Sequence, residues 1–397
     1  MTKWNRKVAV VGVGQTYHRT RRPDVNQLEM VGEAVRAAFE DAQLTPKDID
    51  FNVVGNMELF EGIHEPDMWQ VDGYGGYLRS GIRMTTGGTT GGMLCNSAVN
   101  MVASGLYDVV LAMGFEKQDE GDTTGGITNM ADPLWGKWFQ TGAVSGGSAG
   151  GGMGGGPGGR SVQDLELLAA KLRVQLADNA ARNPYAHLRQ KLTVEDVMNS
   201  PYLVPPLRRL HMCPQSCGAC CVIFACEEKA KKITNKPVWV KDHVTVHRGS
   251  FGGGIPGAGS AAAESTMRYA ARKLYQRNGI TEPLKQIDLF EMYDPNVWWH
   301  IAWMADFLLL PPGENWNMVE RGDTAIDGTF PINPSGGVVA TNPIGATGMV
   351  RLAEAALQIR GDAGEHQVTK KEVKTAIASS FGGSLWTILQ LLSKSPD

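Results

Sequence analysis

Two distant stretches of the chain repeat the same order of apolar and polar positions. Residues 34–45 place apolar side chains at intervals of three and four, a short polar turn follows, and residues 51–54 form an apolar run. Residues 270–281 and 289–292 repeat this order around a similar turn. Apolar positions at helical spacing predict an amphipathic helix, and a short apolar run between turns predicts a buried strand. Each stretch therefore predicts a helix followed by a strand.

A second pair of stretches extends this match. A helix predicted over 90–105 precedes an apolar strand at 108–113, and a helix predicted over 347–361 precedes a strand at 373–378. Internal similarity of this kind is the mark of a duplicated architecture, and alternating helices and strands are typical of layered α/β proteins. The pattern therefore predicts two α/β halves with the same order of elements.

The stretch between the halves, roughly 117–205, departs from this alternation. Residues 145–159 are mostly glycine and serine, which predicts a flexible loop that serves either as a linker or as a lid. Residues 134–139 just before it form an aromatic cluster. Ser161 and Asp164 then match a capping box, so a long helix is predicted from there to about Arg182.

Composition and charge narrow the possible functions. The chain has 397 residues, of which 42% are hydrophobic and 20% charged, as in ordinary globular proteins. A formal net charge of −3 gives no basic surface for nucleic acid or an anionic membrane. We see no apolar signal region and no apolar run long enough to span a bilayer, so we expect a cytoplasmic protein.

The six cysteines are unevenly placed. Cys95 stands alone, and five follow within fourteen residues: Cys213, Cys217, Cys220, Cys221 and Cys226. With His211, the spacing of Cys217 and Cys220 is compatible with a metal site. However, residues 218–226 predict a buried strand, whose successive side chains point to opposite faces, so Cys220 and Cys221 cannot share one site. We favour buried, reduced cysteines and no metal, with the metal site as the alternative.

Two loops near the C-terminus identify a family. Residues 333–337 read Asn-Pro-Ser-Gly-Gly, and residues 342–348 read Asn-Pro-Ile-Gly-Ala-Thr-Gly. They resemble the C-terminal active-site loop of thiolases, and residues 181–186 and 193–201 resemble sterol-carrier-protein-type thiolases. The resemblance covers nearly the whole chain and extends to benzoylsuccinyl-CoA thiolase large subunits and thiolase-like steroid side-chain aldolases.

The resemblance implies an α/β thiolase fold, in which duplicated βαβαβαββ halves form αβαβα layers with an inserted loop domain. We expect the N-terminal half to comprise 1–117 with 206–235, the inserted loop domain 118–205, and the C-terminal half 236–397. A homodimer is implied as well, since the fold usually pairs through its central strands. Coenzyme A is then expected as a substrate, with Ser335, Gly345 and Ala346 among the residues that bind it.

The same resemblance shows that the usual catalytic side chains are missing. Alignment on the strand at 108–114 places the nucleophilic cysteine of the family at Gly88, which has no side chain to attack with. Asn342 stands in place of the histidine; its amide donates hydrogen bonds but does not carry protons at neutral pH. The final glycine-rich turn lacks the second cysteine, although Gly383 retains a backbone N–H for an oxyanion hole. The glycines around residue 88 form either a tight turn or a nest of N–H groups for an anion.

Three nearby features have open roles. Tyr293 takes the place of an Asn or His that orients an oxyanion-hole water, and it serves either in proton transfer, as in the thiolase-like aldolases, or in packing. Cys95 is either a nucleophile or, as we favour, a core residue. We expect Asp294 to be structural, accepting N–H groups at a helix start, and His300 to be a surface or hydrogen-bonded core histidine. Trp298, Trp299 and Trp303, at helical spacing, predict either core packing or, with Trp135 and Trp138, an aromatic acyl pocket.

These features leave three functions open. The first is retro-Claisen thiolysis of a bulky or aromatic β-oxoacyl-CoA, with CoA attacking directly because Gly88 leaves room. The second is a retro-aldol lyase on a β-hydroxyacyl-CoA that uses Tyr293. The third is a non-catalytic subunit that binds acyl-CoA. By resemblance, a small zinc-ribbon/OB-fold subunit is the expected partner.

Overall fold

The computed structural model describes residues 4–122, 160–247, 264–382 and 386–397. The aromatic cluster at 134–139, the glycine-rich tract at 145–159 and Gly383 lie outside these residues, so the interpretations placed on them stay predictions.

Within the described residues, nine strands form one mixed sheet in the order β3-β2-β4-β7-β1-β8-β11-β10-β9. Their bounds are β1 Val8–Gln15, β2 Phe51–Gly55, β3 Ser80–Arg83, β4 Val109–Glu116, β7 Gly218–Cys226, β8 Val238–His247, β9 Leu289–Glu291, β10 Thr375–Gly382 and β11 Trp386–Ser393. A separate two-stranded sheet joins β5 Tyr202–Val204 to β6 Leu207–Arg208.

The sheet order confirms the duplication. Outward from the antiparallel contact between β1 and β8, one half runs β1-β7-β4-β2 and the other runs β8-β11-β10-β9. In the first half, β1 with β7 and β7 with β4 are antiparallel, and β4 with β2 is parallel. In the second half, β8 with β11 and β11 with β10 are antiparallel, and β10 with β9 is parallel. The outermost strand of the first half, β3, leaves one backbone edge of the sheet without a partner strand among the described residues.

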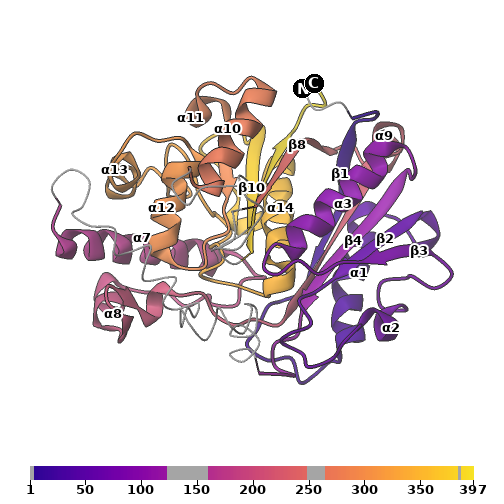
Figure 1. The fold of residues 1–397 in the computed structure, drawn as a ribbon, viewed down its shortest axis with the longest axis horizontal. Coiled ribbons are helices and arrows are strands. Elements are labelled where there is room, and N and C mark those ends of the chain that lie inside the picture. The colour runs from indigo at the N-terminus through magenta and orange to yellow at the C-terminus, as the bar shows by residue number, and fades with distance from the viewer. Residues whose placement is uncertain (1–3, 123–159, 248–263, 383–385) are drawn as a thin grey trace, which may run out of the picture.

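The helices lie in layers about this sheet (Figure 1). Their bounds are α1 Gln27–Ala42, α2 Asp67–Gln70, α3 Thr90–Ser104, α7 Val162–Arg182, α8 Val194–Asn199, α9 Glu227–Ile233, α10 Thr266–Asn278, α11 Pro283–Gln286, α12 Val297–Phe307, α13 Glu314–Arg321 and α14 Ile344–Arg360. Helices α3 and α14 pack on each other at the centre, α1 covers β1 and β7 outside, and α10 covers β8 and β11. The expected α/β thiolase layering is therefore confirmed.

Three hydrophobic cores occupy the spaces between these layers. The central core joins α3 and α14 to inward-facing strand residues, and separate cores lie beneath α1 and beneath α10 and α12. Strand β7 shows the alternation clearly, because Cys220 lies in the central core and Cys221 in the outer core under α1. The two thiols therefore point to opposite faces, as the strand pattern predicts.

Local signals in the sequence fix the helix ends. Ser161 and Asp164 form the predicted capping box at the start of α7. Gly105 and Gly361 end α3 and α14 in left-handed conformations, with φ of 90° and 76°, where a side chain would be strained. Strand β7 follows α7 and α8 in the chain. It lies between β4 and β1 and so belongs to the first half of the sheet.

Candidate functional site

The site lies where the first turns of α3 and α14 meet. A Cβ atom at Gly91 would lie 2.6 Å from the backbone nitrogen of Met349, and one at Gly348 would lie 2.8 Å from that of Gly92. Since real Cβ atoms are not found that close to backbone, only glycine permits this contact between the helices. The glycine-rich sequences before and within both helices therefore bring two helix N-termini together, where partial positive charge is concentrated.

The turn before α3 is held by its own threonines. The hydroxyl of Thr89 donates to the carbonyl oxygen of Thr86 at 2.5 Å, and that of Thr90 donates to the carbonyl oxygen of Gly87 at 2.6 Å. Gly87 has a φ of 65°, which the turn requires. These bonds fix the backbone at Gly88, the position where the resemblance implies the family nucleophile.

Tyr293 fills the space beside Gly88. A Cβ atom at Gly88 would lie 3.3 Å from the Tyr293 hydroxyl and only 2.5 Å from the carbonyl oxygen of Phe381. The expectation that Gly88 leaves an open space is therefore wrong, because the end of Tyr293 and the backbone of β10 take up that volume. Gly88 and Tyr293, two predicted site residues 205 positions apart in the sequence, do lie together.

The environment of Tyr293 keeps its hydroxyl protonated and available. The side chain is 5% exposed, and its hydroxyl makes no hydrogen bond to any of the described residues. Burial raises the pKa of Tyr293, and negative charge at Cys213 or Glu116 would raise it further. Its backbone is fixed from both sides, since the Tyr293 amide donates to Ser379 at 3.0 Å and the Met292 amide donates to Asn333 at 2.6 Å.

Asn342 presents a donor to the site. Its Oδ1 lies 2.8 Å from the Thr347 hydroxyl, which also lies 3.0 Å from the Pro343 carbonyl oxygen. The Nδ2 donates to Cys213 Sγ at 3.3 Å and has a second hydrogen to give. Its backbone is held by Ser216 at 3.0 Å and Gln118 at 2.9 Å. Asn342 is thus held in place by its backbone, and its role as a hydrogen-bond donor to substrate stays a prediction.

The predicted coenzyme A contacts have other partners. The Ser335 hydroxyl lies 2.7 Å from Glu291 and 2.6 Å from Arg351, and all three side chains are fully buried. The Gly345 N–H donates to Glu116 at 2.6 Å, and Ala346 belongs to the central core. The geometry therefore gives these residues the task of shaping the loops, and a direct contact with CoA remains a prediction without geometric support.

A pair of acidic side chains braces the start of α14. Glu116 is fully buried and hydrogen-bonded to Glu61, whose Oε1 accepts from the Lys117 N–H at 2.8 Å. Burial raises the pKa of both carboxyl groups, and their proximity adds to the effect at Glu116. Two carboxyl groups this close share a proton.

Asp294 and His300 form a buried pair behind the site. Their Oδ2 and Nδ1 atoms lie 2.8 Å apart, and both side chains are fully buried. Asp294 also accepts a hydrogen bond from the Val338 N–H at 2.6 Å, which ties the Tyr293 turn to the loop after β9. Asp294 is thus structural, as expected, but the cap of α12 is Asn296, which accepts from the Trp299 N–H. His300 is a hydrogen-bonded core histidine.

The tryptophans of α12 divide between the two expected roles. Trp298 is a core residue whose indole N–H donates to His211 Nδ1 at 3.1 Å. Trp299 and Trp303 are half-buried and stack at 4.7 Å between ring centroids. Both also contact Phe381, at 5.6 and 4.4 Å, and Phe381 lies 6.4 Å from Tyr293. An aromatic wall therefore leads to Tyr293, while Trp135 and Trp138 lie outside the described residues.

The cysteines differ sharply in access. All six are free, and Cys213 alone among them is partly exposed. Cys95 has no exposed surface, lies in the central core, and has a pKa raised by burial, which argues against its use as a nucleophile. Cys217 lies in the outer core, and His211 is engaged with Trp298, so these two do not converge. No cluster of three potential ligands is present in the described ranges.

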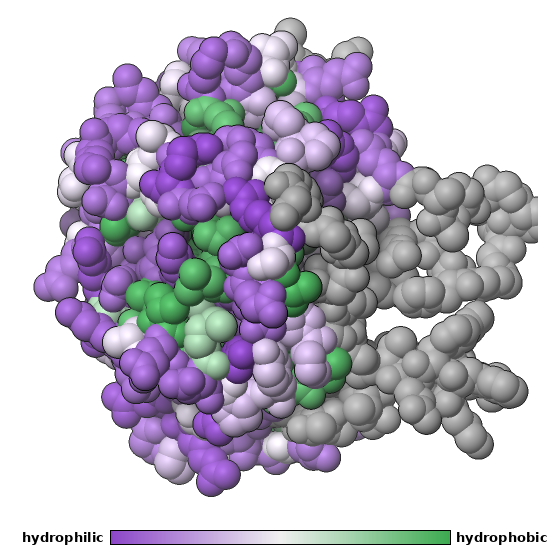
Figure 2. Space-filling view, turned by 90° about the vertical axis from the view of Figure 1, so that its left-hand side faces the viewer, coloured by the Kyte–Doolittle hydropathy of each residue, from purple (hydrophilic) through white to green (hydrophobic). Residues whose placement is uncertain are grey.

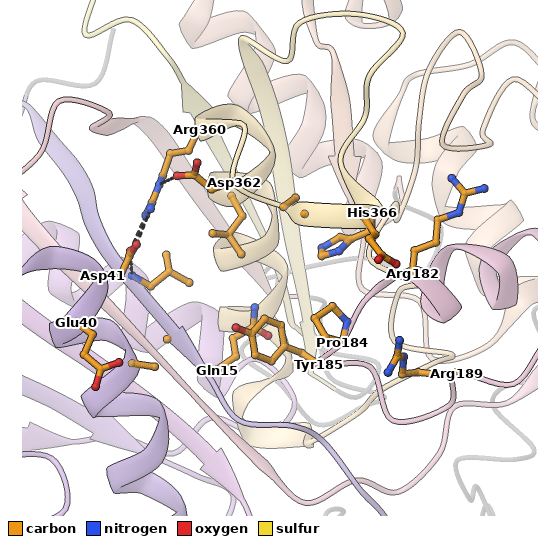
Figure 3. Close-up of a pocket in the computed structure, with 17 residues that line it drawn as sticks. Gln15, Glu40, Asp41, Arg182, Pro184, Tyr185, Arg189, Arg360, Asp362 and His366 are labelled. Carbon is orange, nitrogen blue, oxygen red and sulfur yellow. Dashed lines mark hydrogen bonds and ion pairs between the residues drawn. The ribbon is translucent and has the colours of Figure 1, made fainter.

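A cavity of the described part lies away from this site. It has a volume of about 740 Å³ and is lined by residues of β1, α1, α14 and the segment after α7. On one wall Arg360 bridges Asp41 and Asp362, while Arg182 and Arg189 lie on the other side (Figure 3). Because it meets α14 at Leu357 and Arg360, it is about 20 Å from the first turn of that helix at 1.5 Å per residue.

The surface over α7, α8 and α13 is largely hydrophilic, with small groups of hydrophobic residues (Figure 2). Larger exposed apolar side chains gather on the segment that leads to β3, where Trp69 is 73% and Leu78 is 87% exposed. Across the described ranges, none of the helices combines the length and apolarity that a membrane span requires.

The layers, the paired helix N-termini and the two loops define a protein of thiolase fold. A family model described as "Thiolase C-terminal domain-like" matches residues 258–392. An acetyl-CoA acetyltransferase of Methanothermobacter thermautotrophicus is 33% identical over 397 residues, covering 96% of this chain and 97% of the relative. Sterol carrier protein 2 of Bos taurus is 27% identical, covering 96% and 71%.

Two further similarities agree. Benzoylsuccinyl-CoA thiolase subunit BbsB of Thauera aromatica is 28% identical and covers 92% of each chain. The solved structure of the Ltp2-ChsH2(DUF35) aldolase matches with a TM-score of 0.79 at 20% identity and covers 98% of each chain. The chain belongs to the thiolase superfamily, is similar to its sterol-carrier-protein-type members, and is an enzyme of thiolase-type acyl-CoA chemistry.

Proposed function

We propose that this enzyme cleaves the bond between the α and β carbons of an acyl-CoA without forming an acyl-enzyme at residue 88. The observation that carries the proposal is the Tyr293 hydroxyl, unpartnered among the described residues and 3.3 Å from the Cβ position of Gly88. A proton donor therefore stands where relatives of this fold are expected to carry a nucleophile.

The reaction we favour is retro-Claisen thiolysis of a β-oxoacyl-CoA by free CoA. The CoA thiolate adds to the β carbonyl, and Tyr293 donates a hydrogen bond to the oxygen as it becomes an alkoxide. Collapse of this intermediate breaks the carbon–carbon bond and leaves the enolate of the second thioester. The raised pKa of Tyr293 suits this role, because the phenol stays protonated at neutral pH.

Asn342 is proposed to hold the thioester oxygen of that enolate. Its Nδ2 has a hydrogen beyond the one given to Cys213, and the Thr347 hydroxyl contacts its Oδ1 at 2.8 Å. Gly88 and Gly383 remain the proposed backbone contributors to the same oxyanion hole. A fixed donor of this kind contributes on the order of 10²–10³ in kcat.

The acyl group is proposed to be bulky or aromatic. The stack of Trp299 and Trp303 continues through Phe381 to Tyr293, which gives a planar apolar surface beside the reacting carbons. Offset stacking on such a surface favours an aromatic ring over an alkyl chain. The Thauera aromatica relative is named for benzoylsuccinyl-CoA, an aromatic acyl-CoA, which supports the same choice.

The second candidate is retro-aldol cleavage of a β-hydroxyacyl-CoA. The observation that favours it is the occupied space at Gly88, since this reaction needs no attacking thiol. It requires Tyr293 to accept the hydroxyl proton, however, and a phenol with a raised pKa is a weak base at neutral pH. We therefore place it second.

A panel of matched β-oxo- and β-hydroxyacyl-CoA substrates, aromatic acyl groups included, distinguishes the two reactions by mass spectrometry. Two acyl-CoA products that require free CoA support thiolysis. An aldehyde or ketone with one acyl-CoA, formed without free CoA, supports the lyase. If neither substrate class is cleaved in the presence of any co-purifying subunit, both reactions are contradicted. The remaining function is then a non-catalytic subunit that binds acyl-CoA.

We also propose that the enzyme is a homodimer that pairs through β3. Among the described residues β3 has no partner strand on its outer side, so it is an edge strand and not one of the central strands that the resemblance implies. The segment before it exposes Trp69, Tyr77 and Leu78. A free strand edge beside an apolar surface invites pairing. Light scattering on the purified chain tests this, and Leu78→Asp should shift a dimer to a monomer.

A small zinc-ribbon/OB-fold subunit is the further partner we propose. The names of the benzoylsuccinyl-CoA thiolase subunit and of the Ltp2-ChsH2(DUF35) aldolase describe proteins with more than one component. Co-expression of this chain with such a subunit, followed by size-exclusion chromatography, tests the pairing.

A further inference from the structure

We propose that Cys213 is an additional catalytic residue, whose thiol protonates the α carbon of the enolate thioester formed between Tyr293 and Asn342. This proposal rests on the proposed function, since both cleavage reactions end on such an enolate. It assigns a role to a residue that lies far in sequence from both helix starts.

The chain brings Cys213 alongside the Tyr293 turn. The Cys213 N–H donates to the Pro295 carbonyl at 3.0 Å, and Met212 pairs with Asn296 in an antiparallel bridge. The segment that enters β7 therefore runs beside the segment that carries Tyr293. At its end, Cys213 Sγ lies 3.3 Å from the Asn342 Nδ2 that we assign to the thioester oxygen.

A second observation marks this space as a binding site. The Tyr293 side chain is 95% buried and ends in a hydroxyl that has no partner within the described ranges. A buried polar group normally has a hydrogen-bond partner. A buried hydroxyl without such a partner among the described residues, beside two helix N-termini, therefore indicates that a ligand oxygen binds there. Cys213 contacts Asn342 and lies close enough to Tyr293 for a charge on its thiol to raise the Tyr293 pKa, so it borders the same space.

The electrostatic surroundings make Cys213 an acid and not a nucleophile. Burial raises its pKa to about 12, the Asp294 charge adds to the rise, and the Asn342 N–H partly offsets it. The thiol is therefore protonated at neutral pH, as a proton donor must be. Once the proton has left, the same Asn342 N–H stabilises the thiolate.

With Cys213 as the acid, every proton in the thiolysis reaction is accounted for. The CoA thiol loses its proton to solvent on ionisation, and its sulfur forms the new bond to the β carbon. The bond between the α and β carbons breaks, its electron pair forms the enolate, and the enolate carbon takes the proton from Cys213. The Cys213 thiolate then recovers one proton from solvent, so no oxidant or reductant is needed.

Two variants and one control test the proposal. Cys213→Ala removes the proton, and Cys213→Ser retains a smaller, weaker acid at the same place. Cys217→Ser is the matched control, because Cys217 lies four residues away in the outer core, where its thiol contacts Asp119 at 3.2 Å. Thermal unfolding of all three checks that the fold is kept.

Two readouts follow the acid step. The first is cleavage, with kcat and KM determined separately for the substrate that the panel identifies. The second is exchange of the α-hydrogens of acetyl-CoA in D2O, followed by mass spectrometry. This exchange is enolate formation and protonation without carbon–carbon chemistry, so it isolates the step assigned to Cys213.

For Cys213→Ala we expect kcat and exchange to fall by about 10²-fold or more, the range of general acid catalysis, with KM within about twofold of wild type. Cys217→Ser should match wild type in both. If the wild type cleaves and Cys213→Ala cleaves and exchanges at the same rate, the assignment of Cys213 is overturned while the proposed function stands. If the wild type cleaves no substrate of either class, the proposed function falls and the assignment falls with it.

Discussion

The hydroxyl of Tyr293 lies 3.3 Å from the position that a Cβ atom would take at Gly88. The resemblance to thiolases implies that this is the place of the attacking side chain, and here a phenol from the second half of the chain lies beside it. The hydroxyl of Tyr293 therefore takes up the space beside Gly88 that a nucleophilic side chain at position 88 would need. The predictions below follow from that arrangement and from the groups around it.

Tyr293→Phe should lower kcat by about 10²- to 10³-fold and leave KM little changed. The ring still packs against Phe381, so only the hydroxyl donor is lost, and that donor acts on charge that develops during the reaction. Steady-state kinetics measures the effect. Tyr185→Phe, a change in the remote cavity, is the control and should leave kcat unaltered.

Gly88→Cys should not restore a covalent thiolase. The new Cβ atom would lie 2.5 Å from the Phe381 carbonyl oxygen, so the turn must move. Overpacking of this kind typically costs about 1–3 kcal/mol of unfolding free energy. Denaturant unfolding should show that loss, with Gly88→Ala giving a similar value. A stable variant that carries an acyl group on the new thiol would show that the space is open after all.

Asn342→Asp should lower kcat by about 10²-fold, because the isosteric carboxylate cannot donate to the thioester oxygen. Thr347→Val keeps the amide but removes the hydroxyl that orients it at 2.8 Å, so it should give a smaller loss of about tenfold. Kinetic comparison of the two variants separates the donor from its orientation. Equal activity of Asn342→Asp and wild type would exclude the donor role.

Stability should fall as pH rises from about 5 to 8. Burial raises the pKa of Glu291 from 4.5 to about 7, although Arg351 opposes the rise. The folded state therefore holds a proton that the unfolded state has already lost, so the stabilisation present below pH 4.5 is lost as pH rises towards 7. At about 1.4 kcal/mol per pKa unit this is on the order of 3 kcal/mol.

His366 and Glu354, which lie near Glu291, contribute to stability in different ranges of pH. The pKa of His366 is raised by its pairing with Glu354, despite its burial, so its contribution is also lost as pH rises. Glu354, with a pKa lowered to about 2 by His366 and Gln15, contributes stability above pH 4.5 and affects only acid unfolding. Urea unfolding across pH 5 to 8 measures the slope, and Glu291→Gln should make it shallower. An unchanged slope would exclude Glu291 as its source.

Trp303→Ala should change selectivity more than turnover. Removing this ring breaks the stack with Trp299 and its contact with Phe381 at 4.4 Å, so aromatic acyl-CoA substrates should lose more in kcat/KM than straight-chain ones. A methylene-sized difference in a pocket is worth about 10- to 200-fold, and we expect a change of that order. Competition between a benzoyl and an aliphatic substrate measures it. An equal loss of kcat/KM for the aromatic and the aliphatic substrate would show that Trp303 has a structural role and does not select the acyl group.

The local structure was predictable because its signals are local. The capping box at Ser161 and the glycines at 105 and 361 mark helix ends within four residues, and the structure has those ends. The alternation along 218–226 predicts a buried strand with Cys220 and Cys221 on opposite faces, as observed. The duplicated order of helices and strands appears in the mirrored strand order of the sheet.

The site was less predictable because it depends on distant contacts. Nothing near Gly88 in the sequence indicates that Tyr293 fills the space beside it. The sequence predicts Ser335 as a contact of coenzyme A, whereas the buried Arg351, sixteen positions later on α14, donates to its hydroxyl. The sequence groups Cys213 with the other cysteines of 213–226, and Cys217 also precedes the apolar run, so no local signal indicates the contact of Cys213 with Asn342.

The central claim is carbon–carbon cleavage through Tyr293 without an acyl-enzyme. The most direct test is a single-turnover reaction of the full chain with a β-oxoacyl-CoA and free CoA, quenched and analysed by mass spectrometry of both protein and products. We predict two acyl-CoA products, an unmodified protein at every time point, and loss of the products in Tyr293→Phe. An acyl group on any cysteine that forms and decays at the rate of turnover would contradict the account.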